Sequence, residues 1–174
     1  MIEKRWLKSR DGVDVGVRSA GRDGPAIIFV HGVGSTAAIW DDQLDALASR
    51  FRCFAVELRG NGAAAADPDP QLITRAGFVQ DVLTVADDAA IDRFHLVGCS
   101  LGGVVGFELW RTAADRIASL TIADSFAAYP NGEQTAQTII EGVEAAGNLR
   151  EFAKARVGRV LAPDAPPKRY TETI

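Results

Sequence analysis

The 174-residue sequence has no block of like charge, because its 19 basic and 23 acidic residues are mixed along the chain and leave a net charge of -4. Nucleic acid is therefore not an expected partner, since proteins that bind it gather basic residues on one face. No apolar run approaches the roughly 18 residues that cross a bilayer, and the first residues lack the basic-then-apolar order of a signal peptide. We expect a cytoplasmic protein with no membrane partner.

Cysteine is scarce, with only Cys53 and Cys99, and each lies in or beside an apolar run. Such thiols behave as small buried hydrophobic groups, so a disulfide framework is not expected and a reducing compartment fits. We expect neither a metal ion nor a cofactor. The oligomeric state stays open.

Short apolar runs separated by helical patterns organise most of the chain. Two alternating stretches, residues 5–9 and 13–18, predict a hairpin around Asp11 and Gly12. Four denser apolar runs follow, at residues 26–30, 53–56, 94–97 and 120–123. Near-continuous apolar strands are typical of parallel sheets covered by helices on both faces. The predicted fold class is therefore α/β, with a doubly wound, mostly parallel sheet.

Helical periodicity fills the gaps between these strands. Apolar residues recur at helical spacing from Trp40 to Ala48, behind a Ser35–Thr36 cap, and again from Phe78 to Ala86. After residue 123 the pattern changes, because residues 134–146 and 149–161 both read as helical with no strand between them. We divide the chain into a core of residues 1–129 and a helical insertion of residues 130–174.

The strongest chemical signal is a serine flanked by glycines at a strand-to-helix junction. Gly98, Ser100 and Gly102 form G-x-S-x-G between the predicted strand and a helix over residues 101–113. On such a turn the serine backbone is strained and its Oγ stands above the sheet edge, which requires small residues on either side. The helix N–H groups also point toward a developing oxyanion. Ser100 is the candidate nucleophile; the alternative is that these small residues only pack a helix on a strand.

A second motif follows the first parallel strand, where His31 and Gly32 begin an H-G-x-x loop. Together with G-x-S-x-G, this loop resembles the α/β-hydrolase superfamily. The resemblance implies that the backbone N–H groups of Val33 and Leu101 form the oxyanion hole. Each such donor typically contributes about 3 kcal/mol of transition-state stabilisation. His31 itself is similar to the structural histidine of that loop, so we do not expect it to be the base.

Three further motifs carry the same resemblance between residues 6 and 128. They are W-x-x-Q-L from Trp40, E-x-R-G-x-G from Glu57, where the family usually has Asp, and L-x-I-A-D-S from Leu120. The nearest subgroup comprises the 3-oxoadipate enol-lactonases and related small-ester esterases. The resemblance implies a serine hydrolase that forms an acyl-enzyme on Ser100 with a small carboxylic ester or lactone. It also implies that residues 130–174 begin a helical lid.

Two alternatives from other classes remain open. Gly32, Gly34 and Ala37 also fit G-x-G-x-x-A, and Glu57 ends the next strand where an acidic residue would hold a ribose. A Rossmann-type dinucleotide-binding oxidoreductase would explain these residues, but it would leave the serine elbow and the preceding hairpin unexplained. A non-catalytic ligand-binding relative of the hydrolases is the other alternative. A P-loop is excluded, because neither glycine motif is followed by Lys and Ser/Thr.

The sequence lacks a histidine after Ser100, although a hydrolase triad has the chain order Ser, Asp or Glu, His. His95 precedes Ser100 on the same strand, about 16 Å away at about 3.3 Å per residue, and is expected to pack at the strand start. Asp124 ends the next strand and is the candidate acid. Because the base and, by resemblance, the C-terminal strands are absent, we expect these residues to be a fragment or a truncated product that is nearly inactive by itself.

Overall fold

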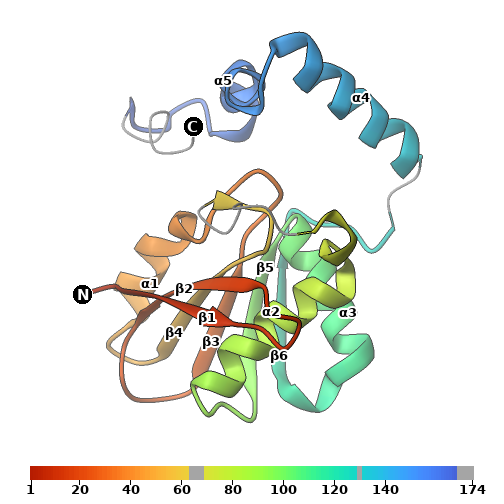
Figure 1. The fold of residues 1–174 in the computed structure, drawn as a ribbon. Coiled ribbons are helices and arrows are strands. Elements are labelled where there is room, and N and C mark those ends of the chain that lie inside the picture. Colours follow the sequence, from red (N-terminus) through yellow and green to blue (C-terminus); the bar gives the residue numbers. More distant parts are fainter. Residues whose placement is uncertain (63–68, 129–130, 168–174) are drawn as a thin grey trace. The chain divides into compact units, whose positions relative to one another are not determined.

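The computed structural model describes residues 1–62, 69–128 and 131–167. The chain divides into two units, Met1–Ala127 and Ala128–Ile174, of which the first holds the sheet and the second two helices (Figure 1). The predicted boundary between residues 129 and 130 lies outside the described residues.

A mixed sheet forms the larger unit, with six strands among the described residues in the order β1-β2-β4-β3-β5-β6. The strands are β1 (Glu3–Lys8), β2 (Asp14–Ala20), β3 (Ala26–Val30), β4 (Arg52–Glu57), β5 (Phe94–Cys99) and β6 (Ile117–Ala123). β1 pairs antiparallel with β2, and β2 with β4, whereas β4, β3, β5 and β6 run parallel. The predicted mostly parallel sheet with N-terminal antiparallel strands is confirmed.

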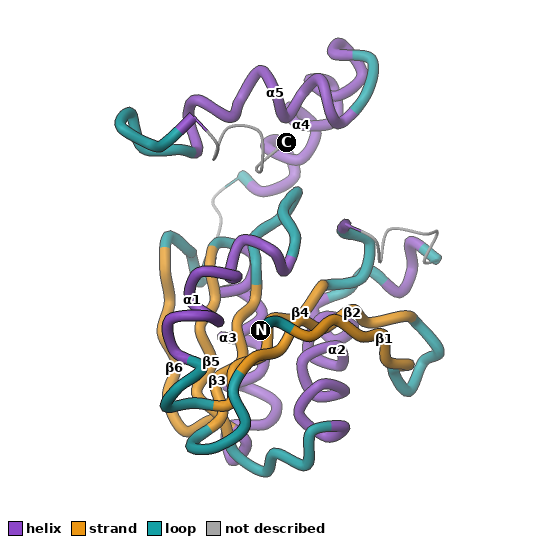
Figure 2. The backbone as a smooth tube through the Cα atoms, turned by 90° about the vertical axis from the view of Figure 1, so that its left-hand side faces the viewer, coloured by secondary structure: helices purple, strands orange, loops and turns teal. Residues whose placement is uncertain are grey.

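Helices cover both faces of this sheet (Figure 2). α2 (Arg75–Asp88) and α3 (Leu101–Ala113) pack on one face, where Ile28 and Val30 of β3 join their buried cluster. The short helix η1 (Ala37–Trp40) and α1 (Asp41–Leu47) cover the other face, over Ile27 and Phe29. Every residue of β3 is buried, as expected for a central strand with helices on both sides.

The structure adjusts several predicted boundaries. β6 begins at Ile117 rather than at residue 120, because Ile117 and Ser119 already pair with β5. The helix expected behind Thr36 is divided: the Thr36 hydroxyl accepts the Ala38 N–H at 3.3 Å and starts the tighter η1, and α1 begins only at Asp41. A short helix η3 (Pro70–Leu72) precedes α2, and η4 (Ala114–Arg116) leads from α3 into β6.

The smaller unit consists of α4 (Gly132–Ala146) and α5 (Leu149–Val160). Gly147, at φ 83°, ends α4, and the Asn148 side chain caps α5 by accepting the Glu151 N–H at 3.0 Å. The two helices pack where the Phe152 ring lies against Gly142, where a Cβ would come within 2.6 Å of the ring. None of the helices within the described ranges combines the length and the hydropathy that a membrane crossing requires.

Candidate active site

The residues singled out by the sequence motifs follow the carboxyl ends of parallel strands. His31 and Gly32 come directly after β3, Ser100 after β5 and Asp124 after β6. Parallel neighbours end at the same edge of a sheet, and ligands of open α/β sheets bind outside that edge. The register supports this grouping, because Val30 lies beside Gly98 and Cys99 beside Ala123.

Ser100 occupies a strained turn between β5 and α3. Its φ is 52°, a left-handed value that residues with a side chain rarely adopt. The end of β6 and the residues after it hold this turn in place: the Ser100 N–H donates to the Ala123 carbonyl at 3.1 Å, and the Ser125 hydroxyl donates to the Ser100 carbonyl at 2.6 Å. Strain of this kind persists only where surrounding structure fixes it, and it is typical of functional residues.

Glycines surround the turn because backbone atoms leave no space for a side chain. A Cβ on Gly98 would lie 2.3 Å from the Gly102 carbonyl oxygen, and one on Gly102 would lie 2.1 Å from the Val30 carbonyl oxygen. At these two glycines, strand β5, helix α3 and the end of β3 therefore approach one another through backbone atoms. This close packing sets where the Ser100 hydroxyl stands relative to the loop after β3.

The loop after β3 lies against the serine side chain. A Cβ on Gly32 would be 3.1 Å from Ser100 Cβ and 3.6 Å from its Oγ. Among the described residues, no acceptor is hydrogen-bonded to the backbone N–H of Val33 or of Leu101. Two N–H groups without an acceptor in this part of the chain therefore belong to residues next to Gly32 and Ser100 in the sequence, at the loop after β3 and at the start of α3. Donors of this kind can stabilise an oxyanion.

Both ring nitrogens of His31 contact backbone groups of the fold. The side chain is fully buried, Nε2 accepts the Leu58 backbone N–H at 3.1 Å, and Nδ1 lies 2.7 Å from the Gly32 carbonyl oxygen. Because Nε2 must accept, the proton sits on Nδ1 and the ring is neutral. Burial lowers the pKa of His31 below its usual 6.5. A ring held in this way fixes the loop and has no free nitrogen with which to take a proton from Ser100.

Because His31 is buried in its neutral form, we expect the free energy of unfolding to fall on mild acidification. The unfolded chain binds a proton at His31 near pH 6.5, but the folded chain does so only at lower pH, so the free energy of unfolding declines as pH falls below about 6.5. Urea unfolding between about pH 8 and about pH 5 measures this slope in the range where histidines titrate. His31→Gln keeps an acceptor for Leu58 and should flatten the slope. A slope that disappears with His95→Gln and persists with His31→Gln would contradict the assignment.

The other two candidate groups do not complete a triad within the described residues. His95 Nδ1 lies 2.7 Å from the Ser119 hydroxyl, on neighbouring positions of β5 and β6. Asp124 is exposed at φ 44°, and no histidine is its hydrogen-bond partner in the described part of the chain. Burial and the Asp124 charge both raise the pKa of the Cys99 thiol. Among the described residues, the geometry thus brings the loop after β3 against Ser100 and places no histidine as its hydrogen-bond partner.

Two side chains of the E-x-R-G-x-G motif, Asn61 and Glu57, also shape the loop after β3. Asn61 accepts the Gly34 N–H at 3.3 Å and thereby ties the loop after β3 to the turn after β4. The Glu57 carboxylate accepts the Ala37 N–H at 2.6 Å, and its other oxygen lies so close to Gly62 that a Cβ there would clash. Glu57 therefore caps η1 and is not available to hold a ribose. From the sequence, Glu57 had a role only as a ribose ligand and Asn61 had none, although the E-x-R-G-x-G motif contains both residues.

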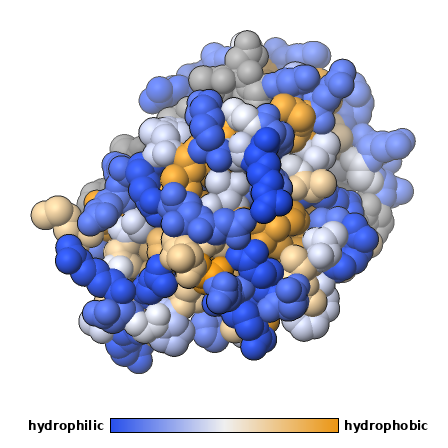
Figure 3. Space-filling view, turned by 60° about the horizontal axis from the view of Figure 1, so that its bottom comes forward, coloured by the Kyte–Doolittle hydropathy of each residue, from blue (hydrophilic) through white to orange (hydrophobic). Residues whose placement is uncertain are grey.

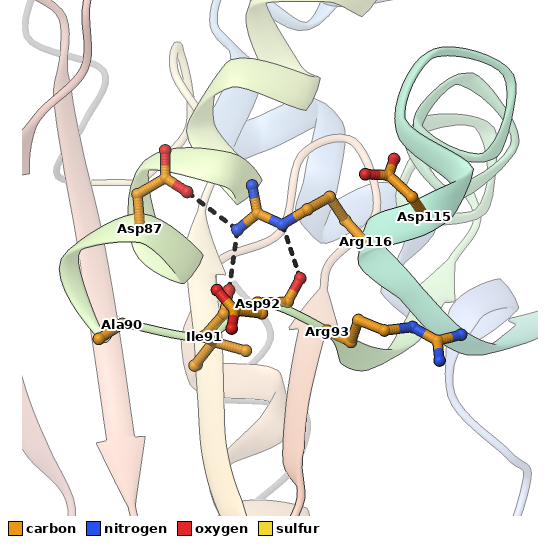
Figure 4. A pocket seen from close by; sticks show the side chains of 7 residues that line it. All are labelled: Asp87, Ala90, Ile91, Asp92, Arg93, Asp115 and Arg116. Carbon is orange, nitrogen blue, oxygen red and sulfur yellow. Dashed lines mark hydrogen bonds and ion pairs between the residues drawn. The ribbon is translucent and has the colours of Figure 1, made fainter.

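A separate pocket of about 450 Å³ lies at the opposite end of the sheet. Of the two arginines that line it, Arg116 donates to Asp87 at 2.9 Å and to the carbonyls of Ile91 and Asp92 at 2.8 and 2.7 Å (Figure 4). The face of the molecule toward this end is mostly hydrophilic, with smaller apolar patches between (Figure 3). Arg116 thereby links η4 to the end of α2 and to the loop that follows it, and the residues that line the pocket include no serine, threonine or cysteine.

A strained serine elbow on a doubly wound sheet defines a hydrolase-type fold, and the comparisons with known proteins agree. Residues 27–173 match the sequence model of the Alpha/beta hydrolase family. The chain therefore belongs to the α/β-hydrolase family.

Individual relatives are similar over part of their length. The 3-oxoadipate enol-lactonase 1 of Acinetobacter baylyi is 31% identical over 127 residues, which are 72% of this chain and 47% of that protein. The crystal structure of a hydrolase from Pseudomonas aeruginosa PA01 is 31% identical in sequence, with a TM-score of 0.82. The match spans 97% of this chain and 65% of the chain in that structure. The enol-lactonase from Burkholderia xenovorans LB400 has 25% identity and a TM-score of 0.77, covering 89% and 59%. Among eight curated relatives, this chain spans 26% to 51% of their length.

Proposed function

We propose that the chain carries the nucleophile and oxyanion hole of a serine hydrolase that acts on a small carboxylic ester or lactone. The observation that carries the proposal is Ser100 at φ 52°, between β5 and α3 and against Gly32. Similarity to enol-lactonases supports the ester or lactone class of substrate.

The chemistry follows from where the groups lie. The Ser100 Oγ attacks the carbonyl carbon and forms a new C–O bond, while its proton passes to a general base. The carbonyl oxygen becomes an oxyanion that accepts hydrogen bonds from the backbone N–H groups of Val33 and Leu101. Expulsion of the alkoxide, which takes up the proton, leaves an acyl group on Ser100, and water then releases the acid. A lactone follows the same steps, with the leaving alkoxide still attached to the acyl chain.

The general base in this proposal comes from outside these 174 residues. The chain has two histidines. His31 uses both ring nitrogens within the fold, and His95 is paired with Ser119. Ser100 by itself keeps the weak nucleophilicity of an ordinary hydroxyl, and the oxyanion donors and binding alone supply about 10³ to 10⁴ over water. We propose that Asp124 contributes the acid that orients such a base, and that α4 and α5 belong to a lid.

The test is covalent labelling of the chain by a fluorophosphonate, with imidazole added as a soluble base and the adduct measured by intact-protein mass spectrometry. Slow addition of one label is expected, since the proposal assigns the oxyanion donors to this chain and the base is supplied externally. Ser100→Ala should abolish the label. Cys99→Ala is the matched neighbour and should retain it, because burial and Asp124 keep that thiol protonated.

Two outcomes would count against the proposal. A label that persists in Ser100→Ala would place the nucleophile elsewhere. A chain that stays folded, as judged by circular dichroism, but takes no label at any imidazole concentration would favour a non-catalytic ligand-binding relative.

A further inference from the structure

Arg59 is fully buried although it carries a charge, and it lies in the turn that follows β4. A guanidinium group has five N–H donors, and here each has an acceptor. Nε donates to Asp81 at 3.0 Å, Nη1 to Asp11 at 2.6 Å and to the Leu72 carbonyl at 3.1 Å, and Nη2 to Asp81 at 2.7 Å and to Asp11 at 3.3 Å. Because the group is planar and bound from several sides, its orientation is fixed.

The acceptors of Arg59 come from segments that lie outside the candidate active site. Asp11 is in the turn between β1 and β2, and Asp81 is on α2. Asp81 also accepts the Arg59 backbone N–H at 3.1 Å, so the main chain of the turn after β4 is bound to α2 as well. Gly77 of α2 leaves the space that the side chain needs, since a Cβ there would lie 2.9 Å from Nη1.

The same turn holds the loop after β3 at two places. The Leu58 N–H donates to His31 Nε2 at 3.1 Å, and the Asn61 carboxamide oxygen accepts the Gly34 N–H at 3.3 Å. Val33, the proposed oxyanion donor, lies between these two held residues in the chain. The position of its N–H group therefore depends on where the turn after β4 stands.

Stability alone does not account for this arrangement. Well-packed apolar side chains of similar volume often stabilise an interior as well as a buried ion pair does. What a fully bonded guanidinium adds is one defined orientation for the backbone that carries it. In this protein that backbone is the turn that holds the loop after β3.

We propose that Arg59 is a positioning residue: Asp11 and Asp81 fix its guanidinium group, and the turn after β4 then sets where the Val33 N–H stands. The chemical consequence rests on the proposed function, because that N–H acts only when Ser100 attacks a carbonyl group. A misplacement of about 1 Å in a reacting geometry can lower a rate about 10²-fold. The β1–β2 turn and α2 thereby influence a reaction whose groups they do not touch.

The rate of fluorophosphonate labelling at Ser100, with imidazole present, tests the effect on the reaction. Arg59→Lys keeps a positive charge beside both carboxylates but replaces the planar group by an ammonium with fewer donors. Labelling should slow by about tenfold to about a hundredfold in protein that is folded by circular dichroism. Arg116→Lys is the matched control, because it makes the same change at the opposite end of the sheet, and it should label like the parent chain.

A second measurement follows the loop itself and does not require a reactive serine. Amide hydrogen exchange and ¹⁵N NMR of the histidine ring report on the two bonds that hold the loop. In Arg59→Lys, the Leu58 and Gly34 amides should exchange faster relative to those of β3, and the His31 Nε2 signal should shift as its donor moves. Arg116→Lys should leave these signals as they are in the parent.

A milder variant keeps the test decisive if Arg59→Lys does not fold. Asp11→Asn removes one of the two carboxylates at a position that is 32% exposed, and it should slow labelling several-fold. Asp14→Asn is its control in the same hairpin, since Asp14 pairs only with the exposed Lys8 among the ion pairs of the described residues. It should label at the parent rate.

The two measurements separate failure of this proposal from failure of the proposed function. Parent labelling rates in Arg59→Lys and Asp11→Asn would overturn the positioning role, and so would unchanged exchange at the Leu58 and Gly34 amides. A parent chain that takes no label would refute the proposed function, and amide exchange would then decide alone whether Arg59 positions the loop.

Discussion

Asp81→Ala is expected to lower the free energy of unfolding by about 3–5 kcal/mol, because it leaves the Arg59 charge buried without its main partner. Both side chains of the pair are 0% exposed. Arg59 donates to Asp81 through Nε at 3.0 Å and through Nη2 at 2.7 Å, and its backbone N–H also donates to that carboxylate at 3.1 Å. Urea unfolding followed by circular dichroism measures the loss.

The matched control for this variant is Asp11→Ala, which removes the other carboxylate bound to the same guanidinium. Arg59 donates to Asp11 at 2.6 Å and, together with Ser9, lowers the pKa of that carboxyl to about 2. Asp11 is 32% exposed, so water replaces part of the lost interaction and the expected cost is smaller. Equal losses for the two alanine variants would show that burial does not set the cost.

A second control separates the buried charge from the lost packing. Replacing both partners by apolar residues, as in Arg59→Met/Asp81→Leu, removes the unpaired charge and should recover much of the stability lost in Asp81→Ala. The recovered protein would still lack the Arg59 bond to the Leu72 carbonyl, which is 3.1 Å long. A double variant as unstable as Asp81→Ala would indicate that the network is needed for its geometry rather than for charge compensation.

Local sequence pattern predicted the strands and the longer helices of the sheet unit, but not the short helices η3 and η4 or the start of β6. The five-residue apolar run of β3 was predicted with its observed limits. A strand buried on both faces is apolar at every position, so its first and last residues stand out from the polar residues around it. The hairpin of β1 and β2 followed from alternation on either side of a turn. By contrast, the Arg59–Asp81 pair was not predicted: the two residues lie 22 positions apart, and charged residues are usually expected at the surface.

In the candidate site, too, some residues could be predicted from local sequence and others depend on contacts between distant segments. Gly98 and Gly102 could be assigned from G-x-S-x-G, because the tight turn itself requires them. The contacts of Ser125 with the Ser100 carbonyl and of Asn61 with Gly34 could not, since they depend on which loops meet at the sheet edge. The neutral form of His31 likewise follows only from the position of the Leu58 N–H, which no sequence pattern specifies.

The contact between α3 and β3 should tolerate no side chain at position 102. Gly102→Ala would place its Cβ 2.1 Å from the Val30 carbonyl oxygen and 3.0 Å from that of His31, and these are backbone atoms within or next to a paired central strand. The helix would have to move away from β3, at a cost of about 1–3 kcal/mol or more for overpacking. That movement would carry the Leu101 N–H away from the loop that holds Gly32, so fluorophosphonate labelling of Ser100 should fall further than stability alone explains.

Gly158→Ala is the matched control, because it also adds a methyl group to a helical glycine but meets no atom within 4 Å. It should be neutral or stabilising by up to about 1 kcal/mol, since alanine favours the helix more than glycine does. Urea unfolding and labelling rates of the two variants, measured under conditions where both are folded, give the comparison. If Gly102→Ala labels as fast as Gly158→Ala, the close approach of α3 to β3 does not position the oxyanion donors, and the site must hold the substrate carbonyl in another way.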